Sequence, residues 1–412
     1  MKIVTNFILL LLSLSTLFSA TIEIKRDNTH FREGPGAWYP VIETLPKGTE
    51  MEQLLADEED DYGQWLRVRL GIAEGCISQI AIKDLPPKKD IFANMAKQST
   101  STSSSRHGVS AGVKGFGEKF SKSFKGDASF LEQAIFYQIN PKEYKKFKKA
   151  TYKGFSLRRN LSKIKLPKQE REEFFTEAER GLGLGISTVI AGQGFYPDKK
   201  LQDYVNYVGL QLVEAFELTE IEFKFFILSM HNPNAYATPG GVIFITKGML
   251  DLCNNEAELA VILAHEIVHV AYNHGMKEIV ERRNHIAADN TFAELDNEYT
   301  MYDEETAAVE AELEEDAFQI YETLIAGRLD QYEKEADQVG MIVAARAGYD
   351  AKVLPIMLER IGKYTVKSNN EHYRPDIINQ RMKWALSYLK SIKFPDNLML
   401  QEQRFKTETA RK

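Results

Sequence analysis

The sequence predicts an α+β protein of two folded units: a small all-β unit, then a larger, mainly helical domain that contains a small sheet. Residues 22–84 alternate apolar and polar side chains between glycine- and proline-rich turns, as short strands do. Apolar segments with helical spacing dominate the second half of the chain. The length of 412 residues allows a leader segment, a small module and one domain of about 260 residues.

Residues 1–20 have the features of a secretory signal peptide. Lys2 supplies a positive charge, an apolar run fills residues 7–18, and Ser19 and Ala20 are small residues at the expected cleavage position. Phe18 is bulky for its place there, so an uncleaved N-terminal anchor is the alternative. We therefore expect export to the periplasm or cell envelope. No later run approaches the roughly 20 apolar residues of a membrane span.

Residues 21–84 are expected to form the small all-β unit. Turn signals occur at Gly34-Pro35-Gly36, at residues 46–49 and 62–65, and at Gly71. With the segment Trp65-Leu66-Arg67-Val68-Arg69, their order resembles bacterial SH3-like modules, and this resemblance implies a small β-barrel. It also suggests a cell-wall or peptide ligand, although such barrels serve as spacers too.

Residues 85–130 are expected to be a flexible linker, because the serine- and threonine-rich run at 98–105 and the glycines beyond it bury little surface. The large domain is expected to occupy residues 131–396, and residues 397–412 to form a polar C-terminal tail. Cys76 and Cys253 are the only cysteines, and we expect two unpaired thiols.

The net charge of −7 conceals two charged segments. Residues 142–171 are dense in lysine and arginine, which allows peripheral association with anionic lipid. Residues 294–316 contain acidic residues and no basic one. This acidic segment either gates the cleft or is a solvated helical insertion, and the second case is the more common. Aromatic residues are not interleaved with the basic ones in a nucleic-acid-binding pattern, so we expect no nucleic-acid partner.

The chemistry concentrates in His265-Glu266-Ile267-Val268-His269, an HExxH motif. Asn255 and Glu258 precede it as a capping box, and the apolar residues that follow predict a buried helix. At a spacing of four, the two imidazoles lie one turn apart on one helix face and can bind a single Zn²⁺. Glu266 is then placed to take a proton from a water that the metal activates. The alternative is a chance motif with two ordinary core histidines.

A second pair of residues can complete such a site. Glu333 and Asp337 stand four apart on one face of a predicted helix. Glu333 can serve as the third metal ligand and leaves the fourth position to water. Asp337 can accept the free ring N–H of a ligand histidine, which fixes the tautomer of that ring. Glu335 points away from this face and is the weaker candidate.

Residues 234–248 (NAYATPGGVIFITKG), the HExxH motif and the Glu333-x-x-x-Asp337 pattern together resemble the zinc metallopeptidase family that includes the HtpX, BepA, Oma-type and CAAX prenyl proteases. The similarity covers roughly residues 175–350. It implies a zincin-type fold with one Zn²⁺ per chain. In this family pattern the zinc ligands are His265, His269 and Glu333, the general base is Glu266, and Asp337 is the partner of a ligand histidine. Processing of prenylated proteins is disfavoured, because that chemistry needs membrane-spanning helices.

The resemblance also implies how a peptide substrate would bind. Residues 240–246 would form an edge strand, along which an extended peptide pairs through its backbone amides. For Gly240 and Gly241, a plain turn before a core strand is the alternative. The substrate-binding residues expected on this basis are Asn234, Gly240, Gly241, Val242 and Ile243.

One element departs from the family pattern, which has a His-Pro pair followed by an arginine. Here the order is His372-Tyr373-Arg374-Pro375-Asp376, and then Arg381. Arg381 is expected to keep the part of the arginine in orienting the substrate or the oxyanion. His372, Tyr373 or Arg374 can donate to the oxyanion. For His372 the alternatives are a surface histidine and a residue that closes the fourth zinc position.

From these observations we expect a zinc-dependent metalloendopeptidase of the cell envelope. Its substrates would be unfolded or extended polypeptides, and its role the quality control or processing of exported proteins. The alternative is an envelope-binding or chaperone-like protein with a latent zinc site. No cleavage preference follows from the sequence.

Overall fold

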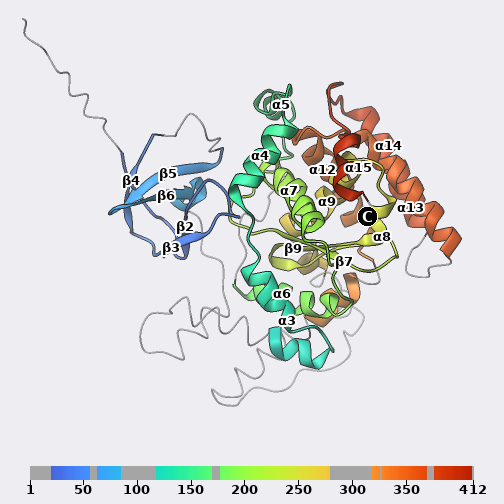
Figure 1. Cartoon of the computed structure of the whole chain (residues 1–412), viewed down its shortest axis with the longest axis horizontal. Helices are drawn as coiled ribbons and strands as arrows, with labels where there is room; N and C mark the ends of the chain where they lie inside the picture. The colour runs from blue at the N-terminus through green and yellow to red at the C-terminus, as the bar shows by residue number, and fades with distance from the viewer. Residues whose placement is uncertain are drawn as a thin grey trace, which may run out of the picture. The chain divides into compact units, whose positions relative to one another are not determined.

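The computed structural model describes residues 20–55, 63–84, 117–168, 177–278, 315, 317–324, 327–368 and 375–410. These residues divide into two compact units near residue 85, and residues 36–40 are counted with the second unit. In Figure 1 the strands of the first unit are blue, and the second unit runs from teal to red. The expected α+β class is confirmed.

Several predicted segments fall outside the described residues. Only Ala20 of the expected signal peptide is described, and the expected linker is described only from residue 117 onwards. Of the acidic segment 294–316, only Glu315 is described. His372 also lies outside the described residues.

The first unit is an antiparallel sheet of six strands in the order β1-β4-β5-β6-β2-β3. Its core is formed by Ile24, Phe31, Leu45, Met51, Val68 and Ile77, all of which are buried. The expected all-β unit is therefore present, and its resemblance to SH3-like modules stays a prediction. The elements are β1 (Thr21–Glu23), β2 (Thr29–Arg32), β3 (Val41–Leu45), β4 (Glu50–Gln53), β5 (Trp65–Leu70), β6 (Ala73–Ser78) and the 3₁₀ turn η1 (Gln79–Ile82).

The second unit is mainly helical. Among the described residues of the whole chain, no helix is long and apolar enough to cross a membrane. Before the sheet come α3 (Ser129–Phe136), α4 (Pro141–Thr151), α5 (Leu157–Lys163), α6 (Glu177–Ala191) and α7 (Lys199–Ala215). After it come α8 (Lys247–Leu252), α9 (Glu256–Ala271), α12 (Asp330–Arg346), the turn η3 (Ala351–Val353), α13 (Leu354–Ser368), α14 (Pro375–Ser391) and α15 (Glu402–Thr409).

A three-stranded sheet lies beside α9 in this unit. It consists of β7 (Lys224–Leu228), β8 (Ala235–Ala237) and β9 (Val242–Thr246), with the turn η2 (Pro239–Gly241) between the last two. All residues of β7 and β9 are buried, and their sequences are apolar apart from Lys224 at the start of β7 and Thr246 at the end of β9. The strand order is β7-β9-β8, so β9 is the central strand and β8 lies at an edge.

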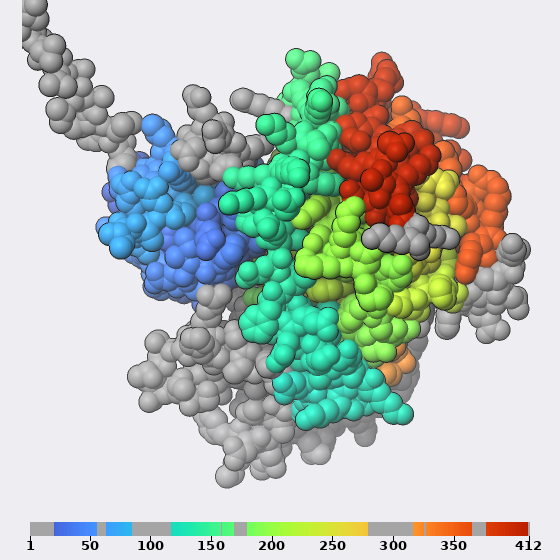
Figure 2. Space-filling model, in the orientation of Figure 1, coloured from blue at the N-terminus to red at the C-terminus, as the bar shows by residue number. Residues whose placement is uncertain are grey.

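Two predicted boundaries of the large domain are wrong. Phe120 and Phe130 lie within the expected linker, yet they are 1% and 0% exposed and pack in the core beside the sheet. At the other end, the expected tail contains α15, whose Phe405 is buried. The red C-terminal residues lie against the body of the unit in Figure 2. In both places a few buried aromatic side chains pack a mostly polar segment against the core. The average composition of such a segment does not reveal these single aromatic residues.

Helix α9 is the centre of the unit, because all 16 of its residues are buried. Asn255 is the N-cap, and its side chain accepts from the Glu258 N–H at 3.0 Å. The Glu258 carboxylate accepts at 2.7 Å from the N–H of Asn254, one residue before the position that a standard capping box would use. Helix α12 packs closely on α9 at Gly340, where an added Cβ atom would lie 3.1 Å from the backbone nitrogen of His265. This glycine therefore sets how near α12 comes to the HExxH motif.

Both cysteines are free thiols, as predicted, and both are buried. Burial raises the pKa of the Cys253 thiol well above its ordinary value. Neither residue lines the pocket described below.

Replacement of Gly183 by alanine tests how the turn η2 is held. Gly183 lies in α6 where that helix crosses η2, and an added Cβ atom would lie 1.7 Å from the carbonyl oxygen of Pro239. Helix propensity alone favours alanine by about 1 kcal/mol. We nevertheless expect Gly183→Ala to lower the free energy of unfolding by roughly 1–3 kcal/mol, because the backbones of α6 and η2 would have to move apart. Urea denaturation measures this change, and an unchanged or higher midpoint would contradict the close contact.

Candidate metal centre

Three side chains of α9 face a pocket although the helix around them is buried. His265, Glu266 and His269 are 6%, 9% and 3% exposed, and all three line the pocket. Because the histidines are four residues apart, their rings lie on one face of the helix, with the centroids 4.6 Å apart. The two imidazoles therefore lie together on one helix face, as their spacing in the sequence predicted.

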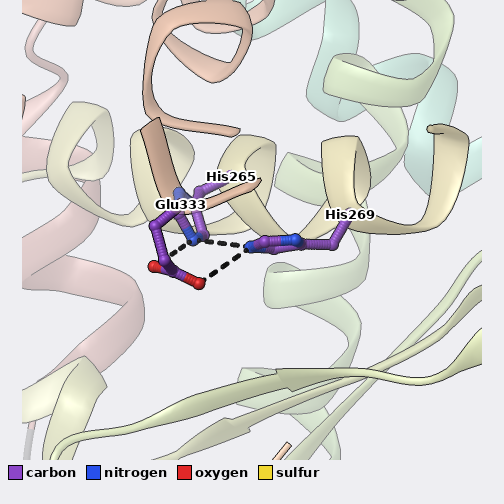
Figure 3. Close-up of side chains that lie close together, drawn as sticks. All are labelled: His265, His269 and Glu333. Atoms are coloured by element: carbon purple, nitrogen blue, oxygen red, sulfur yellow. Dashed lines mark hydrogen bonds and ion pairs between the residues drawn. The ribbon is translucent and has the colours of Figure 1, made fainter. Parts of the chain in front are cut away.

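Glu333 joins the two histidines from α12 (Figure 3). The two Nε2 atoms are 3.0 Å apart, and the carboxylate oxygens of Glu333 lie 3.5 Å from Nε2 of His265 and 3.4 Å from Nε2 of His269. Ligand atoms about 2.0–2.1 Å from a tetrahedral Zn²⁺ would lie about 3.3–3.4 Å from one another. The donor types and these separations therefore fit a zinc ion.

Asp337 makes the contact with a ligand histidine that was expected of it. Its Oδ1 atom lies 2.9 Å from Nδ1 of His265, and the side chain is fully buried. Burial acts to raise the pKa of Asp337, but Arg381 and the hydrogen bond to His265 hold that pKa below its ordinary value. An ionised Asp337 accepts the Nδ1–H, so that loss of the second ring proton of His265 frees the Nε2 lone pair towards the site.

Arg381 reaches the site from α14 and binds both carboxylates of α12. Its Nη1 lies 2.8 Å from Glu333, and its Nη2 and Nε atoms lie 2.7 and 2.9 Å from the two oxygens of Asp337. The expected part of Arg381 in orienting substrate stays a prediction. In this structure its guanidinium forms ion pairs with both carboxylates, which offsets part of their negative charge and holds them in place.

Glu266 is the remaining functional side chain of the motif. Burial raises its pKa above the ordinary value and Glu333 acts in the same direction, while His265, Arg328 and Arg381 oppose them. A raised carboxyl pKa suits a general base that must later act as an acid. The walls around it are mainly apolar, formed by Met249, Ile262, Leu324, Leu358, Ile361, Ile377 and Ile378.

The expected substrate strand is wrong in its position. Val242 and Ile243 belong to β9, which pairs with β7 on one side and β8 on the other, so its backbone has no free edge. Gly240 and Gly241 have φ angles of 80° and 101° and form a turn before the strand, as the alternative had it. Asn234 does line the pocket, next to Ala235 at the start of the edge strand β8.

Sequence reasoning missed two residues of the site. Arg328 is 8% exposed, lines the pocket, and donates from Nη2 to the carbonyl oxygen of Ala237 at 3.1 Å. His274 is fully buried and lies 2.9 Å from the ring of His269. An additional histidine five residues after the motif was a visible signal, whereas nothing local distinguishes Arg328. Glu335, the weaker candidate ligand, contacts His274 instead of the ligand cluster.

The comparisons with known proteins cover this region of the chain. Residues 199–370 match peptidase family M48. The putative beta-barrel assembly-enhancing protease of Vibrio cholerae is 31% identical over 170 residues, which are 40% of this chain and 33% of the relative. The beta-barrel assembly-enhancing protease of Escherichia coli is 27% identical over 164 residues, again 40% and 33%. The mitochondrial metalloendopeptidase OMA1 of Schizosaccharomyces pombe is 24% identical over 158 residues, which are 38% and 43%.

The matched regions span about a third of the length of the first two of these relatives. The family match contains all three candidate ligands and Glu266. It therefore supports a metallopeptidase, in agreement with the geometry of the site.

Proton release on zinc binding tests the electrostatics of the centre. Burial and Arg381 act to lower the pKa of His265, but its hydrogen bonds to Asp337 and Glu333 outweigh them and raise it to about 9. Burial holds the pKa of His269 well below its ordinary value, so that ring is already neutral. A ligand nitrogen must be deprotonated, so zinc binding at pH 6.5 is expected to release about one proton. Zinc affinity should then fall as the pH falls below 9.

Titration calorimetry in buffers of different ionisation enthalpy measures this release. Asp337→Asn should reduce the number of released protons, because it removes a carboxylate that stabilises the charged ring. A wild-type value near zero would contradict the protonated His265.

Proposed function

We propose that the chain is a zinc-dependent metalloendopeptidase of the cell envelope, because residues 199–370 match peptidase family M48 and contain the candidate metal site. One observation carries the proposal: three ligand atoms of the types that zinc prefers converge beside a buried glutamate in a single pocket. The same arrangement argues against a pair of ordinary core histidines, since those would not need a carboxylate from a second helix.

His265, His269 and Glu333 would hold the ion. A bound Zn²⁺ would polarise the scissile carbonyl and acidify a water molecule. Glu266 takes the proton of that water and passes it to the leaving amine. Asp337 keeps the ring of His265 in the binding tautomer, and Arg381 holds Asp337 and Glu333. No nucleophilic side chain is required, so no acyl-enzyme forms.

An extended polypeptide would bind along β8. This strand pairs only with β9 on its inner side, and its first residue, Ala235, lines the pocket. Addition of a peptide to a sheet edge uses main-chain hydrogen bonds and therefore tolerates many sequences. Arg328 already holds the outward carbonyl of Ala237, so it marks one end of the available edge.

The same proposal includes a biological role in the cell envelope. The names of the relatives refer to beta-barrel assembly and to mitochondria, which favours quality control or processing of exported proteins. The signal-peptide features of residues 1–20 favour the periplasm or cell envelope. The six-stranded first unit would bind a cell-wall or peptide ligand. The exposed lysines of α4 would allow peripheral contact with anionic lipid.

Cleavage of unfolded casein in the presence of zinc tests the proposed activity. We expect the wild-type protein to cleave casein, and Glu266→Gln to lower the rate by about 10²–10⁴-fold, because it removes the general base but none of the ligands. Metal analysis should find one zinc per chain in both proteins. Glu402→Gln, an exposed glutamate on α15, is the control and should retain full activity.

If neither wild type nor Glu266→Gln cleaves casein while each binds one zinc, the site is latent. That outcome would favour an envelope-binding or chaperone-like protein.

A further inference from the structure

His274 and Glu335 form a buried chain of contacts behind the candidate ligand His269. Nδ1 of His274 lies 2.9 Å from Nδ1 of His269, and Nε2 of His274 lies 3.0 Å from Oε2 of Glu335. His274 is fully buried, and the Glu335 side chain is 24% exposed. These contacts lie on the side of the His269 ring opposite to its Nε2 atom, which faces His265 and Glu333.

The path of the backbone explains how His274 reaches this place. Helix α9 ends at Ala271, and Asn273 then adopts a left-handed conformation with a φ angle of 53°. Asparagine tolerates this conformation better than most residues, and here its side chain also donates to Glu179 at 3.0 Å. The reversal directs His274 back along α9 towards His269. Its ring packs against that of Tyr332, with the centroids 4.6 Å apart.

Only one arrangement of protons satisfies both contacts if His269 binds a metal through Nε2. The proton of His269 must then be on Nδ1, from which it is donated to His274. His274 accepts at Nδ1, so its own proton is on Nε2 and is donated to the carboxylate of Glu335. The Glu335 carboxylate therefore fixes the tautomer of His274, and His274 in turn fixes the tautomer of His269.

We propose that His274 and Glu335 are positioning residues for the metal ligand His269, and this inference rests on the zinc site proposed above. Asp337 performs the corresponding task for His265 by direct contact. Residues two apart on a helix point in different directions, so Glu335 is turned away from the face that carries Glu333 and Asp337. His274 lies between Glu335 and His269 and connects them. Helix α12 thus supports both ligand histidines, His265 through Asp337 and His269 through Glu335 and His274.

A purely structural role for His274 makes the opposite prediction from a positioning role. Phenylalanine keeps an aromatic ring next to Tyr332 but has no acceptor for the Nδ1–H of His269. Asparagine loses the ring but keeps an oxygen near the place of Nδ1. If positioning matters, His274→Phe should be the more harmful change to metal binding. If only packing matters, His274→Asn should be the more harmful change, because it removes the ring that packs against Tyr332.

The test compares zinc affinity by chelator competition, and the visible spectrum of the Co²⁺-loaded protein, in the full chain. Loss of such a ligand-orienting partner typically costs about 10–100-fold in metal affinity, which we expect for His274→Phe and for Glu335→Leu. His274→Asn should stay closer to wild type in affinity and spectrum. Asp330→Asn changes an exposed acidic residue on the same helix and should leave zinc affinity unchanged. Thermal unfolding in the presence of a chelator reports the stability of each variant separately.

Wild-type zinc affinity in His274→Phe or in Glu335→Leu would overturn the inference while leaving the proposed function intact. Should His274→Phe fail to fold, Glu335→Leu decides alone. An order of affinities that simply follows thermal stability, with His274→Asn the weakest, would also overturn it. If the wild-type protein binds no zinc, the proposed function and this inference fail together.

Discussion

The burial of α9 is the constraint on which the rest of the second unit depends. This helix lies wholly in the core, yet it carries two glutamates in its first turn and the three polar residues of the HExxH motif. A buried polar or charged group without a partner costs roughly 1–3 kcal/mol or more, so each of the charged and imidazole groups needs a partner from a neighbouring element. Glu256 pairs with Arg404 and accepts from Tyr204 and Tyr349 at 2.8 Å each, and Glu258 pairs with Arg360 at 2.6 Å. Helices α7, α13 and α15 thereby become part of the support of the site.

The second half of α9 is supported in the same way by α12. Gly340 lets the two helices approach closely, and Glu333, Glu335 and Asp337 lie at the end of α12 that reaches the imidazoles. Three carboxylates beside a buried helix would repel one another, and Arg381 offsets two of them. The protein therefore offsets part of the negative charge of the site, and the candidate ligands are held in place by ordinary ion pairs and hydrogen bonds.

The sequence was sufficient where a function depends on local spacing. The N-cap at Asn255, the i,i+4 pairs in α9 and α12, and the contact of Asp337 with a ligand histidine all follow from helix geometry, and the structure has them. The order of strands is not local: whether β8 or β9 lies at the edge depends on a parallel pairing with β7, which no short motif encodes. His274 was missed because its direction depends on one left-handed residue, Asn273. The linker and tail were misjudged because single aromatic residues, Phe120 and Phe405, fix otherwise polar segments.

The ion pair between Arg404 and Glu256 has a consequence for the order of events during synthesis. Glu256 begins the helix that carries the HExxH motif, and its carboxylate is fully buried. Its cationic partner, Arg404, is synthesised 148 residues later. Until that arginine emerges, the nascent chain cannot bury the start of α9 without leaving a charge uncompensated. The core around the HExxH helix is therefore completed late, after nearly all of the residues that pack around it have been synthesised.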